Sequence, residues 1–282
     1  MGTTVGETYL KRLFVFYIPL FMFVAAMLFP FYWMLITSIK PDQELYNVRN
    51  VPFIVRNATS QHWVYLFKET LFARWALNTL WIATASTALS LFAGVLAGYA
   101  LSRLRFPGST AGGIAIFVTY LVPPTLLFIP LADVVSELHL LDTSWALILT
   151  YPTILVPFST WLLMGYFKTI PRELEECARI DGATRLQAMV KIILPLGMPG
   201  ILSAGIFSFT LSWNEFLYAL VFISSPTSKT ISVGVVSELI KGDVFFWGAL
   251  MAGALFGSVP VAIVYSFFVE NYVAGMTGAV KG

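Results

Sequence analysis

The chain has 282 residues, of which 58% are hydrophobic and only 11% are charged, whereas about a quarter are charged in an average soluble domain. This composition excludes a soluble enzyme and a disordered chain, and the single cysteine excludes a disulfide-stapled secreted domain. The net charge of +2 predicts no nucleic-acid partner, so we interpret the chain as a polytopic membrane protein.

Six apolar windows are long enough to cross a bilayer, which takes about 20 residues in a helix. In chain order they are residues 13–36, 75–101, 111–132, 143–167, 192–223 and 244–269. Backbone groups in lipid must be satisfied within the segment, so these windows predict six transmembrane helices and an all-α fold. Lys11 and Arg12 precede the first window, but it is too long for a signal-peptide core, and we interpret it as a retained anchor.

The short connections carry an asymmetric charge. Residues 102–110 contain two arginines and no acid, whereas residues 133–142 contain three acids and no lysine or arginine. Positive charge marks the cytoplasmic side, so we expect both termini to be cytoplasmic. Residues 37–74 then form an extracytoplasmic loop. This loop is either a surface loop lying on the membrane or part of a docking face for an external partner.

Residues 168–191 form the connection with the most helix signals. Pro171 and the acids after it are typical of a helix start, and Asp181-Gly182 is typical of a break. Apolar residues at helical spacing stand on either side of the break: Leu174, Cys177 and Ala178 before it, and Leu186, Met189, Val190 and Ile193 after it. The pattern predicts two short amphipathic helices ending near Pro195. Their apolar faces pack either on the chain's own bundle or in a groove of a cytosolic partner.

Residues 175–196 (EECARIDGATRLQAMVKIILPL) closely resemble the EAA loop of bacterial ABC importer permeases, with its pattern E-A-A-x-x-D-G-A followed by I/L-x-L-P. The matching positions are Glu176, Ala178, Asp181, Gly182, Ala183, Leu194 and Pro195, and Cys177 stands where the family usually has alanine. Residues 31–41, 78–79, 99–108, 213–215 and 278–282 resemble the carbohydrate branch of these permeases, and within it the maltose-transporter MalG type.

The resemblance implies an ABC type I importer permease in the bacterial cytoplasmic (inner) membrane. Residues 1–282 would be a single transmembrane permease domain surrounded by membrane lipid, with residues 168–195 as its cytoplasmic coupling helices. Its expected partners are a homologous second permease, a homodimer of two ATP-binding subunits, and an external solute-binding protein that delivers a sugar. The residues expected to couple to the ATPase are Glu176, Cys177, Ala178, Asp181, Gly182 and Ala183. Glu176 would meet a basic group there, Gly182 would shape the turn, and the C-terminal tail would also reach the ATPase.

The sequence contains no glycine followed by lysine, so it lacks the phosphate-binding loop G-x-x-x-x-G-K-[ST]. We therefore expect a transport subunit that is not an enzyme and binds no cofactor, with ATP and Mg²⁺ held by the partner ATPase. His62 and His139 fall in predicted outside loops, where we expect solvated side chains rather than catalysts or metal ligands.

Glu215 is the one charge well inside an apolar window, and Trp213 and Asn214 precede it. The three residues either face the translocation path, where they would stack on and bond to a sugar, or bond to the partner permease or the backbone near the outer interface. Pro123, Pro124 and Pro130 predict kinks in the third helix. Glycerol phosphate or a modified sugar is an alternative substrate, and an ion-coupled secondary transporter is a remote alternative function.

Overall fold

The computed structural model describes residues 11–47, 49–242 and 244–278, so the final residues of the tail that resembles the family lie outside the described residues. Contacts divide the chain into two compact units. The first unit contains the described part of Met1–Thr70 together with Val235–Phe256, and the second contains Leu71–Gly234 and the described residues from Gly257 onward. Each unit is described by itself.

The first unit begins with a π-helical turn, Leu13–Tyr17, that continues into α2 (Ile18–Ile39). The short helices α3 (Asp42–Leu45) and α4 (Gln61–Lys68) follow, and β1 (Ile240–Lys241) pairs antiparallel with β2 (Val244–Phe245). His62 is buried beside the Lys40 carbonyl oxygen, 2.7 Å from its Nε2 atom, so the expectation of a solvated side chain is wrong for this residue. Its ring packs directly over Gly248, where a Cβ atom would clash with it.

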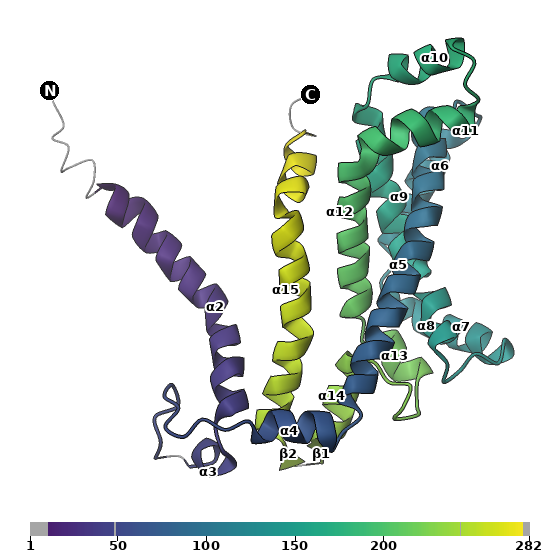
Figure 1. The fold of residues 1–282 in the computed structure, drawn as a ribbon. Coiled ribbons are helices and arrows are strands. Elements are labelled where there is room, and N and C mark those ends of the chain that lie inside the picture. The colour runs from purple at the N-terminus through teal and green to yellow at the C-terminus, as the bar shows by residue number, and fades with distance from the viewer. Residues whose placement is uncertain (1–10, 48, 243, 279–282) are drawn as a thin grey trace, which may run out of the picture. The chain divides into compact units, whose positions relative to one another are not determined.

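The core of the second unit is formed by three long helices, α5 (Phe72–Arg103), α9 (Pro152–Thr169) and α12 (Leu194–Trp213) (Figure 1). Glycine allows α5 and α9 to approach closely, because a Cβ atom on Gly94 would lie only 2.8 Å from the Cβ atom of Ser159. Two hydroxyl pairs join these helices to α12: Ser86 to Ser212 at 2.8 Å and Ser159 to Ser208 at 2.9 Å.

The third apolar window is not a straight helix. It contains α6 (Ser109–Tyr120) and α7 (Pro124–Glu137), which meet at an angle of 95°. Pro123 precedes a second proline, which disfavours the helical conformation, and its ψ of 132° is extended. Among the described residues, five helices are long and apolar enough to span a membrane, and six spans result if the bent pair counts as one.

The connection after α9 holds α10 (Arg172–Ile180) and α11 (Arg185–Ala188). The second predicted helix does not end near Pro195: α11, a π-helical turn (Met189–Ile193) and α12 form one continuous segment, Arg185–Trp213. The helix continues through Pro195 because this residue stands in the first turn of α12, directly after the π-helical turn. A proline without an N–H is tolerated at that position.

Of the remaining helices, one continues into α9 as a single candidate span, Ser144–Thr169, and the last contains the candidate span Trp247–Ser266. These remaining helices are α8 (Ser144–Thr150), α13 (Leu217–Phe222), α14 (Ile231–Leu239) and α15 (Trp247–Gly278). Within the second unit, α10 and α11 lie at one end of α5 and α12, whereas α7, α8 and α13 lie at the other (Figure 1). This arrangement separates the basic connections from the acidic one, as the charge pattern predicts.

Candidate functional site

The end of α10 is a tight turn held by three backbone hydrogen bonds. The amide of Ala183 donates to the carbonyl of Ala178 at 3.0 Å, the amide of Gly182 donates to that of Arg179 at 3.1 Å, and the amide of Asp181 donates to that of Cys177 at 3.0 Å. The first two bonds form a Schellman motif, which requires a left-handed residue after the helix. Gly182 supplies it with a φ of +91°. Five of the predicted coupling residues, Cys177, Ala178, Asp181, Gly182 and Ala183, therefore build one hydrogen-bonded turn.

A second cap begins the helix on the other side of this turn. The Gln187 amide donates to the Thr184 hydroxyl at 3.2 Å, and the Thr184 amide donates to the Gln187 side chain at 2.8 Å. This reciprocal pair is a capping box, which fixes the direction in which α11 leaves the turn.

The apolar faces of the predicted helix pair are only partly covered. Met189 and Ile193 are buried against Phe167, so the chain's own bundle covers that part. Ile180 is 84% exposed and Leu186 is 65% exposed on either side of the turn. Glu176 and Cys177 are exposed as well. We call α10, the turn and α11 (residues 172–188) the coupling segment; it presents an apolar tip and acidic and basic side chains.

Tyr99 ties the end of α5 to the coupling segment, and Arg103 ties it to the end of α9; the sequence analysis included both only in the range 99–108 and did not choose them as site residues. The Tyr99 hydroxyl donates to the Glu175 carboxylate at 2.6 Å. Arg103 is buried, and its Nη2 donates to the carbonyls of Phe167 and Ile170 at 2.5 and 2.6 Å. Tyr99 and Arg103 are one helical turn apart, and this spacing at the end of an apolar window could have indicated a shared role.

A small cavity of about 200 Å³ lies between α10 and the end of α5. Its charged lining consists of Arg103, Arg105, Arg172, Glu175, Glu176, Arg179 and Arg185. Five guanidinium groups face two carboxylates, so this surface is electropositive although α10 begins with acids.

Trp213 is the last residue of α12, and Asn214 and Glu215 lie in the break between α12 and α13. The Glu215 carboxylate accepts hydrogen bonds from the amides of Tyr218 at 2.8 Å and Ala219 at 3.1 Å, so it caps the start of α13. Trp213 is 7% exposed, and its Nε1 donates to the Gly257 carbonyl at 2.9 Å. Asn214 is exposed. This geometry supports backbone bonding for Glu215 and leaves Asn214 as the member accessible to a ligand.

The second unit also contains a row of aromatic rings contributed by four helices. Ring centroids are 5.8 Å apart for Tyr120 and Phe158, 5.5 Å for Phe158 and Phe207, and 6.4 Å for Phe207 and Tyr265. Tyr120 also lines a cavity of about 390 Å³ at the bend between α6 and α7. The sequence did not reveal this row, because aromatic residues are common in every apolar window.

Residues 90–278 match the family described as binding-protein-dependent transport system inner membrane component. The inner membrane ABC transporter permease protein YcjP of Escherichia coli is 36% identical, over 95% of this chain and 96% of that protein. The sulfoquinovosyl glycerol transport system permease protein SmoH of Agrobacterium fabrum is 37% identical, over 90% and 89%.

The solved structures show the same fold. A bacterial ABC transporter involved in the import of the acidic polysaccharide alginate contains a chain that superposes with a TM-score of 0.80 at 21% identity, covering 96% of this chain and 99% of that one. These findings confirm the resemblance to carbohydrate ABC importer permeases and the helical, multi-pass character of the chain.

Proposed function

Because the chain belongs to the family of binding-protein-dependent transport system inner membrane components, we propose that it is the membrane-spanning permease subunit of an ATP-driven sugar importer. Its substrate class is a di- or oligosaccharide or a glycoside. The observation that carries the proposal is the coupling segment, which combines the family motif with a rigid turn and an uncovered apolar tip. The chain is a multi-pass protein of the inner membrane.

The coupling segment is the element that meets an ATP-binding subunit in the cytoplasm. Ile180 and Leu186 would enter an apolar cleft of that subunit, and Glu176 would pair with a basic group beside it. The bonds from Tyr99 and Arg103 support this role, because the first joins α10 to α5 and the second joins the end of α5 to α9. This sequence has no phosphate-binding loop of its own, so ATP and Mg²⁺ are bound by the partner, a pair of ATP-binding subunits.

Transport then follows alternating access. Closure of the ATP-binding dimer moves the coupling segments of this chain and of a homologous second permease, and the spans change the cavity from inward-facing to outward-facing. An external solute-binding protein delivers the sugar to the outward state, and residues 37–74 belong to the face that receives it. The glycine contacts between α5 and α9 support movement of these helices as one body.

The sugar path is proposed to pass the exposed Asn214 and the aromatic row. Aromatic faces suit sugar rings because the apolar C–H face of the ring covers them, whereas an amide bonds to hydroxyls. Trp213 and Glu215 would then hold the shape of the break rather than bind sugar directly, as their hydrogen bonds support. A modified sugar is the alternative substrate, and the likeness to a sulfoquinovosyl glycerol permease favours it.

The test is a charge reversal on α10. Glu176→Lys should abolish uptake of the sugar bound by the cognate solute-binding protein, while the chain remains inserted at normal abundance. Glu173→Lys makes the same change on the same exposed helix and is the matched control, with uptake retained. Normal uptake by Glu176→Lys would refute the coupling role, and uptake that persists without ATP would refute the ABC importer.

A further inference from the structure

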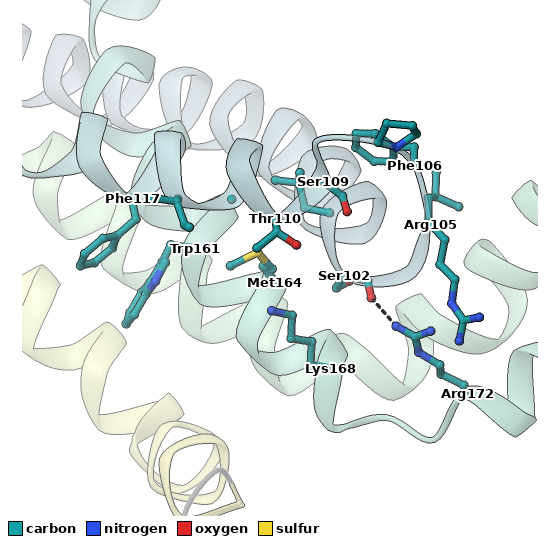
Figure 2. Close-up of a pocket in the computed structure, with 15 residues that line it drawn as sticks. Ser102, Arg105, Phe106, Ser109, Thr110, Phe117, Trp161, Met164, Lys168 and Arg172 are labelled. Atoms are coloured by element: carbon teal, nitrogen blue, oxygen red, sulfur yellow. Dashed lines mark hydrogen bonds between the residues drawn. The ribbon is translucent and has the colours of Figure 1, made fainter.

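A larger pocket of about 620 Å³ lies where α5 and α9 end and α6 begins, and it shares Arg105 and Arg172 with the cavity of about 200 Å³. The loop between α5 and α6 forms one wall with Arg105 and Phe106, and Ser109 at the start of α6 continues it (Figure 2). Met164 and Lys168 of α9 form the opposite wall. Nothing in the transport mechanism above uses this pocket.

One end of the pocket is cationic. Arg105, Lys168 and Arg172 line it, and no carboxylate does. Arg172 donates to the Ser102 carbonyl at 3.3 Å. In the part of the chain that the structure describes, the charged ends of Arg105 and Lys168 make no hydrogen bond or ion pair. The hydroxyls of Ser109 and Thr110 add neutral donors at the same end. The set suits a phosphate group, which guanidinium and ammonium groups bind well.

The other end of the pocket is apolar and belongs to the membrane-spanning part of the helices. The rings of Phe117 and Trp161 lie together there, with centroids 5.5 Å apart (Figure 2). Trp161 is 47% exposed and Ile114 on α6 is 60% exposed. The cavity therefore changes from cationic to aromatic and aliphatic along the direction of the spans, which is the polarity of a phospholipid rather than of a small ion.

We propose that this pocket binds an anionic phospholipid, with its phosphate between Arg105 and Lys168 and an acyl chain along Trp161. Basic pockets between spans at the cytoplasmic side are suited to such headgroups. A free phosphate would gain nothing from the apolar end, and an acidic protein segment would have to enter the level of the spans. The assignment to the cytoplasmic leaflet rests on the proposed function; the pocket itself does not.

The experiment is native mass spectrometry of the assembled transporter, titrated with phosphatidylglycerol or phosphatidylcholine. Wild type should retain phosphatidylglycerol preferentially. A surface cation contributes about a fivefold gain in affinity for an anionic lipid, so Arg105→Gln with Lys168→Gln should weaken phosphatidylglycerol binding roughly 25-fold and leave phosphatidylcholine unchanged. The matched control is Lys11→Gln with Arg12→Gln, which removes the same two residue types from the described start of the chain and should preserve the preference.

A second variant tests the cavity rather than its charge. Thr110→Trp fills the pocket, keeps every cation and should also lower phosphatidylglycerol retention. The lipid site would be overturned if the Arg105/Lys168 variant and the Lys11/Arg12 control lost phosphatidylglycerol binding equally. It would also be overturned if inorganic phosphate displaced the lipid and Thr110→Trp had no effect on its retention. The uptake assay on Glu176→Lys keeps the two proposals apart, because failure of the proposed function would appear there while the lipid preference stood.

Discussion

Gly182→Ala tests the coupling turn at the single residue whose conformation defines it. Gly182 has a φ of +91°, and a Cβ atom there would meet no heavy atom within 4 Å. The substitution therefore creates no clash, and its whole cost is backbone strain of about 1–2 kcal/mol for an L-residue in the left-handed region. A cost of this size lowers the ratio of the native turn to its alternatives by roughly 5- to 30-fold.

Hydrogen exchange across residues 178–184 measures this loss. The amides of Gly182 and Ala183, which donate to Arg179 and Ala178, should exchange faster by the same factor, and sugar uptake should fall. Gly182→Asn should show exchange rates and uptake between those of wild type and Gly182→Ala, because asparagine tolerates the left-handed conformation. Gly165→Ala is the control: it also points into open space but lies within α9, where alanine favours the helix. Unchanged protection and uptake in Gly182→Ala would refute the argument.

Three further predictions concern the framework of the second unit. Arg103→Gln should lower the free energy of unfolding by at least about 1.5–3 kcal/mol, because it removes charged donors from the carbonyls of Phe167 and Ile170; a melting point equal to that of wild type would contradict it. Gly94→Val should separate α5 from α9 and cost about 1–3 kcal/mol in the same assay, whereas Gly165→Val should cost less because it meets open space. Hydrogen bonds from the Ser225 side chain and amide hold the pKa of Asp142 below its ordinary value. The stability this carboxylate contributes is present above about pH 4 and is lost as pH falls through the lowered pKa. The amides of Ser224 and Ser225 should therefore lose exchange protection in that acidic window, and in Asp142→Ala they should lack it at pH 7 as well.

The spans and the turn could be predicted from the sequence because their signals are local. Apolar windows predicted the spanning helices, and Asp181-Gly182 predicted the turn that the structure places after Ile180. Gly182 was recognisable because few other residues adopt its backbone conformation. Proline predicted a kink in the third window, and the structure shows the larger bend of 95° at Pro123.

The tertiary contacts could not be predicted in the same way. Glu215 looked like a buried charge in a span, because apolar composition alone did not show that α12 ends at Trp213 and that the carboxylate caps α13. The pairing of Tyr99 with Glu175 joins residues far apart in sequence, and only the fold brings them together. The expectation that residues 1–282 form a single domain stays a prediction.

Crosslinking from Cys177 tests the coupling segment most directly. This residue is the only cysteine of the chain, it is exposed, and it lies one residue from Glu176. A short thiol-linked photocrosslinker on Cys177 of the assembled transporter, in membrane vesicles, should attach to an ATP-binding subunit, with a yield that changes when ATP and Mg²⁺ are added. Attachment only to lipid, to the external solute-binding protein or to the second permease would contradict the role given to this segment.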